Sequence, residues 1–145
     1  MATRAKVHIA RREEGVSFSE IPKKVIVSIY SHWDGYPEGL GVTLAQYLDG
    51  KVVTNGLGNR EDYSAFNGMG CLAASLVEEL KDGPGNVYIE DPERPHGWID
   101  YDYYVWGDDG KSIWISIFDG SECIFVGKPR ALLSKYYSDG DEFTD

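Results

Sequence analysis

The stretch of sequence richest in side chains that can do chemistry is YSHWDGYPEGLG, residues 30–41. A histidine and a carboxylate can act as a base and its partner, and aromatic rings can stack on a planar ligand. The stretch follows a predicted strand and precedes a predicted helix, where outward-pointing backbone amides suit an anion. The residues expected to form a ligand site here are His32, Trp33, Asp34 and Tyr36.

Turn formation offers a second explanation of the same segment. Asp34-Gly35 is a common turn pair, and Pro37 suits the first turn of a helix. These three residues are therefore explained by local conformation alone. The side chains that a turn does not require are His32, Trp33 and Tyr36.

Glycine-rich segments precede both predicted mid-chain helices, at Gly39-Leu40-Gly41 and at Asn67-Gly68-Met69-Gly70. Neither matches the known phosphate-binding loop patterns, and glycine is also what irregular loops require. Together with Arg60 they could supply backbone amides and one guanidinium to a phosphate. The residues assigned to this role are Gly39, Gly41, Arg60 and Gly68.

A third group of candidates combines acidic and aromatic residues between Glu90 and Asp102. Trp98 could add a ring to a base-binding site. Asp100 and Asp102, two residues apart on one strand face, could bind a divalent metal together with His32 or His96. A solvated strand face is the favoured explanation of these carboxylates. We therefore predict no metal and no cofactor.

No local signature assembles a Ser/His/Asp or Cys/His catalytic set, which favours binding over catalysis. Cys71 and Cys123 are far apart in apolar surroundings and are predicted to be buried thiols.

The elements that must position these residues follow from hydrophobic periodicity. The expected order is β-β-α-α-β-β-β-β-α, with polar loops at 12–21, 54–68 and 91–97. Grouped helices beside hairpin-linked strands predict an α+β fold, with a mainly antiparallel sheet of about five or six strands and two or three helices on one face. A single domain covers residues 1–145, with 138–145 a frayed acidic tail. The strands are expected at 4–11, 23–31, 86–90, 98–106, 111–118 and 122–126, and the helices near 42–48, 69–80 and 129–137.

The net charge of −10 is unevenly distributed along the chain. Residues 1–60 carry a balance of +2 and residues 61–145 a balance of −12. An acidic surface repels phosphates, so general nucleic-acid binding is disfavoured. No apolar run is long enough to span a membrane, and the N-terminus lacks an apolar signal segment. We expect a soluble protein in the cytoplasm of its host cell.

Four segments resemble a group of small phage and bacterial proteins: MATRAKVHI, YSHWDGYPEGLG, NGMGCLAASLV and IDYDYYVW. Members of this group commonly begin Met-Ala-Thr-Arg and carry a Tyr-x-His-Trp-Asp-Gly-Tyr motif after an early strand. The resemblance implies a phage or mobile-element origin. It marks residues 32–36 as motif positions and supplies no role for them.

Three functional hypotheses follow. The first is a phage-type accessory protein that sequesters a nucleotide-like ligand, such as a host defence signal, between Trp33, Tyr36 and Trp98. The second is an acidic inhibitor of a basic host protein. The third is a small hydrolase that uses His32 and Asp34. The aromatic content is also compatible with a homo-oligomer. The carboxylates that would serve the second hypothesis are Asp100, Asp102, Asp108 and Asp109.

Overall fold

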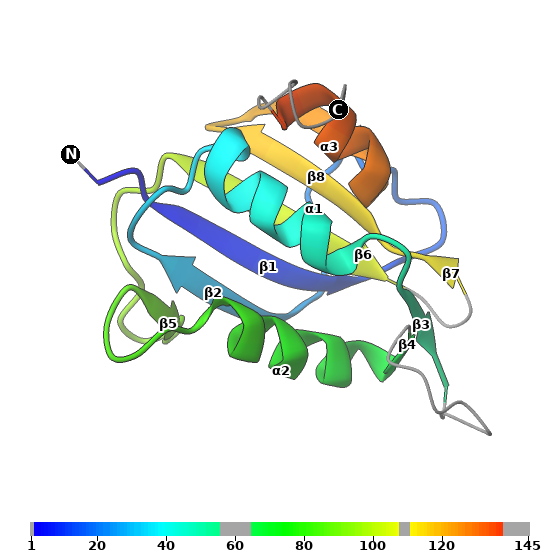
Figure 1. Ribbon diagram of the computed structural model, residues 1–145, viewed down its shortest axis with the longest axis horizontal. Helices are drawn as coiled ribbons and strands as arrows, with labels where there is room; N and C mark the ends of the chain where they lie inside the picture. Colours follow the sequence, from blue (N-terminus) through cyan, green and yellow to red (C-terminus); the bar gives the residue numbers. More distant parts are fainter. Residues whose placement is uncertain (1, 56–64, 108–110, 138–145) are drawn as a thin grey trace, which may run out of the picture.

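A six-stranded sheet forms the centre of the protein in a computed structural model that describes residues 2–55, 65–107 and 111–137 (Figure 1). Its strand order is β5-β2-β1-β6-β8-β9. Strands β1 and β6 are parallel, and the other four neighbouring pairs are antiparallel. The strands are β1 (Ala5–Arg11), β2 (Val25–Ser31), β5 (Val87–Ile89), β6 (Tyr101–Gly107), β8 (Trp114–Asp119) and β9 (Glu122–Gly127).

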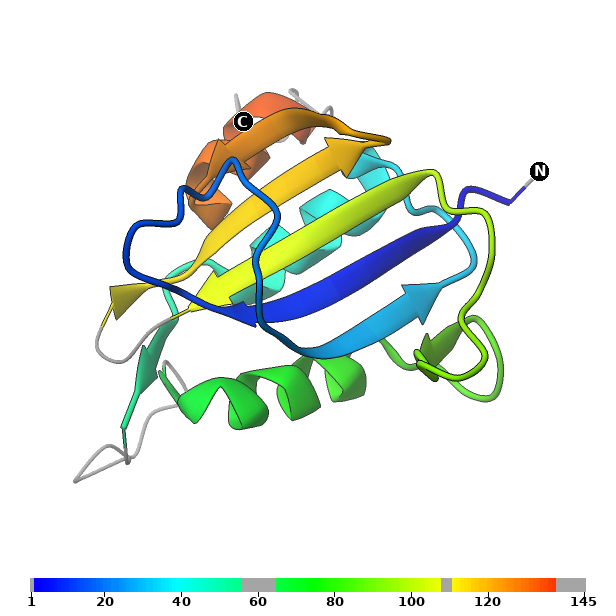
Figure 2. The ribbon, with the colours of Figure 1, turned by 180° about the vertical axis from the view of Figure 1, so that it is seen from behind.

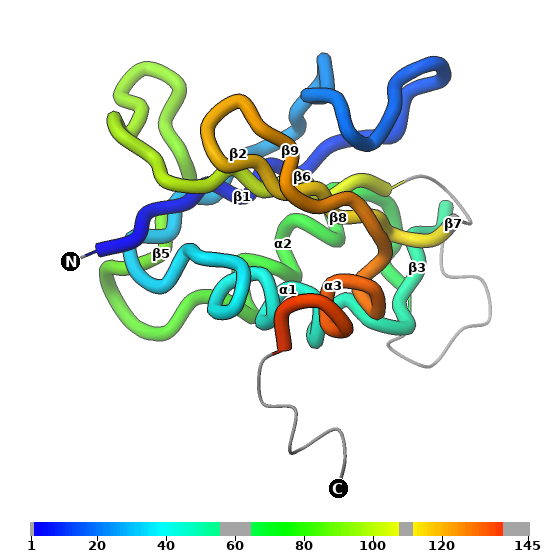
Figure 3. The backbone as a smooth tube through the Cα atoms, turned by 90° about the horizontal axis from the view of Figure 1, so that it is seen from above, coloured from blue at the N-terminus to red at the C-terminus, as the bar shows by residue number. Residues whose placement is uncertain are grey.

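All the helices lie on one face of this sheet (Figure 3). A small second sheet, of order β4-β3-β7, stands at one end. The predicted α+β fold, with its mainly antiparallel sheet and helices on one face, is confirmed. The remaining elements are η1, a π-helical turn (Pro37–Gly41), α1 (Val42–Leu48), β3 (Val52–Thr54), β4 (Ala65–Asn67), α2 (Gly68–Leu80), β7 (Lys111–Ser112) and α3 (Pro129–Tyr136).

The main core lies between the sheet and the helices. Strand β1 shows why: Ala5, Val7 and Ile9 alternate with polar residues, and these three side chains are fully buried on the helix side. Helix α2 contributes an apolar stripe at helical spacing, and Gly83, at a φ of +72°, follows its end. The buried residues of this stripe are Met69, Leu72, Ala73 and Leu76.

The second face of the sheet is covered over only part of its area. The segment between β1 and β2 crosses it (Figure 2). Phe18 in this segment stacks on Trp114 and meets Trp106 edge-on. The indole N–H of Trp106 donates to Ser116 Oγ at 3.0 Å, so this buried polar group is satisfied. The cover leaves polar side chains of β1, β2 and β6 accessible elsewhere on the face.

Several sequence predictions need correction. Strand β4 lies inside the region 54–68 that was predicted to be only a loop, because glycine and asparagine content hid a three-residue strand. Strand β6 begins at Tyr101, so Trp98 belongs to the preceding loop and not to the strand. Cys71 is exposed and Cys123 is partly exposed, so the predicted burial of both thiols is wrong.

In the part of the chain that the structure describes, no helix has the length and apolar character needed to cross a membrane. The turn predicted at residues 108–110 lies outside the described residues, whereas the antiparallel pairing of β6 with β8 is observed. The predicted acidic tail, 138–145, also lies outside them.

Candidate functional site

The chain leaves β2 and passes over the start of β1 before it enters η1. The Gly35 N–H donates to the Thr3 carbonyl at 3.0 Å, and the buried Tyr103 hydroxyl donates to the Gly35 carbonyl at 2.6 Å. A β-carbon at Gly35 would lie 2.7 Å from that of Ala5. Close packing against β1 therefore explains this glycine of the motif.

The start of η1 is held by Asp34, which has a φ of +56°. Its carbonyl accepts the Leu40 N–H at 2.9 Å, and the Tyr36 carbonyl accepts the Gly39 N–H at 2.9 Å. These amides are consumed within the turn and do not point at a ligand. The predicted use of the Gly39 segment as an anion cradle therefore has no support from its backbone geometry.

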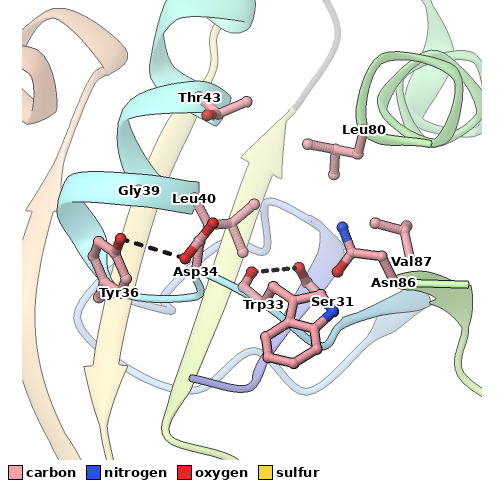
Figure 4. A pocket seen from close by; sticks show the side chains of 10 residues that line it. All are labelled: Ser31, Trp33, Asp34, Tyr36, Gly39, Leu40, Thr43, Leu80, Asn86 and Val87. Atoms are coloured by element: carbon pink, nitrogen blue, oxygen red, sulfur yellow. Dashed lines mark hydrogen bonds between the residues drawn. The ribbon is translucent and has the colours of Figure 1, made fainter. Parts of the chain in front are cut away.

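A pocket of about 240 Å³ opens beside this turn, between the start of α1 and the end of α2 (Figure 4). Its floor comes from the end of β2 and the residues just before and at the start of β5. Trp33 and Tyr36 are 51% and 39% exposed, so both rings are available to a ligand. The lining residues are Ser31, Trp33, Asp34, Tyr36, Gly39, Leu40, Thr43, Leu80, Asn86 and Val87.

Two lining residues have a positive backbone φ, which residues other than glycine adopt less often. Asp34 has a φ of +56° and Asn86 a φ of +65°, and among the described residues they are the two non-glycine positions in this region. The Asn86 carbonyl also accepts the His32 N–H at 2.9 Å, which ties the two loops together. Aspartate and asparagine adopt this left-handed conformation more readily than other residues with a side chain, and here it shapes both loops at the edge of the pocket.

The charge of the pocket is negative. Asp34 is the charged side chain among its ten lining residues, and Tyr36 approaches it with its hydroxyl at 3.4 Å. Asn86 and Thr43 add neutral hydrogen-bonding groups. The pocket thus combines two exposed rings with an acceptor, an arrangement that suits a planar donor and opposes an anion.

His32 belongs to the motif and its ring meets Trp33 edge-on at a centroid distance of 4.7 Å, but it is not among the residues that line the pocket. Its Nδ1 lies 2.7 Å from the Tyr30 hydroxyl, within hydrogen-bond distance. Burial raises the pKa of Tyr30, which keeps the phenol protonated. Because Asp34 is instead contacted by Tyr36, the predicted pairing of His32 with Asp34 is not what these two side chains do.

The other predicted site residues are dispersed. Gly41 is buried against Tyr103 in the core. Gly68 starts α2, whose opposite end reaches the pocket, and 12 helical steps separate the two ends by roughly 18 Å. Trp98 is 67% exposed and is not among the pocket residues. Arg60 lies outside the described residues.

The second face of the sheet carries a polar chain that the sequence did not reveal. Ser28, His8 and Asp102 stand on the neighbouring strands β2, β1 and β6. The ring of His8 lies 2.6 Å (Nδ1) from Ser28 Oγ and 2.8 Å (Nε2) from Asp102 Oδ1. A Ser-His-Asp set is therefore present, although no local signature predicts it.

A second series of contacting polar side chains lies beside the first. Glu90 forms an ion pair with Lys6 and a hydrogen bond with the ring of His96, whose Nδ1 is 2.7 Å from Glu90 Oε1. His96 in turn stacks on Tyr30 at a centroid distance of 3.6 Å. Burial alone would raise the pKa of Glu90, but the contacts with Lys6 and with the backbone and ring of His96 lower it to about 2.

The carboxylates proposed for a metal site or a protein interface are also engaged on this face. Asp100 accepts the Arg4 N–H at 2.8 Å, and Asp102 contacts His8. Among the described residues no group of three or more His, Cys, Asp or Glu side chains could hold a metal ion. Asp108 and Asp109 lie outside those residues.

Comparison of the chain with models of known protein families, with curated proteins and with solved structures finds no match. The function has to be inferred from the two groups of residues described above.

Proposed function

We propose that the protein binds the planar ring of a small nucleotide-like ligand in the pocket formed by Trp33, Asp34 and Tyr36. The observation that carries the proposal is that Asp34 and Asn86, the two non-glycine residues with a positive φ among those described, line a pocket that also exposes two aromatic rings. Proteins commonly read an unstacked base by aromatic stacking and by hydrogen bonds to its edge.

The chemistry of the lining narrows the ligand. The Asp34 carboxylate only accepts hydrogen bonds, so it favours a ring edge that presents adjacent N–H donors, as guanine does. A volume of about 240 Å³ is below the usual range for drug-sized ligands and suits one ring system. The negative Asp34 and the net charge of −10 oppose phosphate in the pocket itself. We infer that the base enters and that any phosphate stays outside.

Sequestration of a host signalling nucleotide is the biological role that we propose for this binding. It rests on the resemblance to phage proteins together with the pocket. It requires that the ligand is held and released without chemical change.

Calorimetric titration with the four common ribonucleosides and their monophosphates tests the proposal. We expect guanosine to bind most tightly and its monophosphate to bind no more tightly than the nucleoside. Trp33→Ala should weaken binding about 5- to 150-fold, the loss of one stacking contact worth about 1–3 kcal/mol. Asp34→Asn should remove the preference for guanosine, and asparagine tolerates the same backbone conformation.

Trp98→Ala is the matched control, because it removes an exposed tryptophan outside the pocket and should leave binding unchanged. Ligand recovered after long incubation should be chemically intact. No heat with any nucleoside, from protein shown to be folded, would refute base binding. Equal weakening by Trp33→Ala and Trp98→Ala would refute the location.

A further inference from the structure

The hydroxyl of Ser28 lies at the end of the hydrogen-bonded series Ser28, His8, Asp102 and beside an open depression. The Asp102 carboxylate can only accept, so in a neutral His8 ring the proton is placed on Nε2, which donates to it. The lone pair of Nδ1 then faces Ser28, whose hydroxyl donates to it at 2.6 Å. The three groups follow the order of nucleophile, base and orienting carboxylate.

The His8 ring is held in place for this role. It stacks on Tyr104 with a centroid distance of 4.7 Å, and its side chain is only 14% exposed. Burial, followed by the nearby Asp102 charge, raises the pKa of Tyr104 to about 12, so the stacked ring is neutral. The stack on Tyr104 and the hydrogen bonds to Ser28 and Asp102 therefore hold the imidazole in place.

Ser28 is also accessible to a small molecule. Strand β5 pairs with β2 at Ile29–Ser31, and the Glu90 N–H donates to the Ser28 carbonyl at 2.8 Å, so β5 and Glu90 leave the backbone edge of β2 unpaired before Ser28. A depression of about 450 Å³ lies there, within the usual size range of small-ligand sites. Its walls are mainly apolar, and Val25 and Ile26 are exposed to solvent. The lining residues are Val25, Ile26, Val27, Ser28, Glu90 and Pro92.

We propose that Ser28 is a nucleophile activated by His8 and oriented through Asp102, and that this depression accepts a small uncharged carboxylic ester. The apolar part of the ester would lie against Val25 and Ile26. No basic residue is among the six that line the depression, and Glu90 is already paired with Lys6, so the lining offers no cation to an anionic ester. This activity is separate from the proposed base binding, which uses the helix side of the sheet.

The reaction balances with water as the second reactant. Ser28 Oγ attacks the ester carbonyl carbon while His8 Nδ1 takes the hydroxyl proton. The carbon–oxygen bond to the alcohol breaks, and His8 returns the proton to the leaving alcohol. Water then attacks the acyl-serine with its proton passing to His8, the acyl–Oγ bond breaks, and that proton returns to Ser28.

The test combines hydrolysis of p-nitrophenyl butyrate with labelling by a fluorophosphonate probe and peptide mass spectrometry. We expect the probe on Ser28, and we expect Ser28→Ala to abolish both labelling and hydrolysis. His8→Gln should reduce both by about 10²- to 10⁴-fold, the usual contribution of a general base. Ser17→Ala is the control, because Ser17 is exposed and its hydroxyl contacts another serine, Ser19, at 2.8 Å.

Asp102 is proposed as a positioning residue and needs a readout of its own. Nitrogen-15 NMR should show the His8 proton on Nε2 in the wild type and a changed tautomer in Asp102→Asn, whose amide can donate to Nε2. Circular dichroism establishes that each variant is folded. Folded wild-type protein that hydrolyses no ester, or that carries the probe anywhere but Ser28, overturns the proposal.

Discussion

Glu90 provides the most quantitative check on the electrostatics of the second sheet face. Its side chain is only 8% exposed and contacts both Lys6 and His96. A carboxyl group whose pKa falls from 4.5 to about 2 on folding stabilises the protein by about 3 kcal/mol at neutral pH. Glu90→Gln preserves the shape and part of the hydrogen bonding, so we expect a loss of about 2 to 3 kcal/mol at pH 7.

The pH dependence follows from the direction of this pKa shift. Because the folded-state pKa is depressed, the stabilisation is complete above about pH 4.5 and is lost as the pH falls towards 2. Urea unfolding should therefore show midpoints of wild type and Glu90→Gln separated by roughly 1 to 2 M at pH 7. Less than about half of that free-energy difference should remain at pH 3, as the same linkage requires.

Glu14→Gln is the matched control, since Glu14 is exposed in the loop after β1. It should change stability by less than about 0.5 kcal/mol at either pH. A difference between wild type and Glu90→Gln that stays constant from pH 7 to pH 3 would refute the electrostatic reasoning. A difference below about 0.5 kcal/mol at pH 7 would do the same.

Three further predictions concern stability. Tyr103→Phe removes the buried hydrogen bond to the Gly35 carbonyl and should cost about 1–3 kcal/mol in urea unfolding, whereas an unchanged midpoint would show that water replaces the donor. Gly35→Ala places a methyl group 2.7 Å from the β-carbon of Ala5 and should cost about 1–3 kcal/mol, measured in the same way; a neutral result would mean that the loop can shift. Because the folded-state pKa of Tyr104 is raised to about 12, the free energy of unfolding should fall as the pH rises from 10 to 12. Urea unfolding of Tyr104→Phe should show a smaller fall over the same pH range.

The fold was predictable because its elements are defined by local patterns. The alternation in β1 and the helical spacing in α2 identify both the element and its buried face. The π-helical character of η1 was not predicted, and β4 is too short to carry a period. Trp98 was assigned to a strand because the alternation of β6 continues backwards into a loop.

The site was only partly predictable, for a related reason. Trp33, Asp34 and Tyr36 are near one another in the sequence, so a local motif was enough to bring them together. Ser28, His8 and Asp102 meet through strand pairing: the register places His8 opposite Ser28 and Lys6 opposite Asp102. Nothing in the sequence fixes the parallel pairing of β1 with β6. The sequence shows the alternation of polar residues within each strand, but it does not show which strands lie next to one another.

Successive side chains along β2 point to opposite faces of the sheet, so the residues of the motif reach two different surfaces. Ser28, Tyr30 and His32 project toward the second face, where Ser28 meets His8 and Tyr30 meets His32. Ser31, between them, is buried on the other side and lines the pocket with Trp33. One strand therefore supplies side chains to two surfaces at successive positions. The His32 ring contacts Tyr30 on the Ser28 face and also meets Trp33 at the pocket, so this histidine lies between the two surfaces. A motif that is continuous in sequence thus reaches two surfaces, and a role for His32 has to be sought next to Tyr30 and Trp33 rather than next to Asp34.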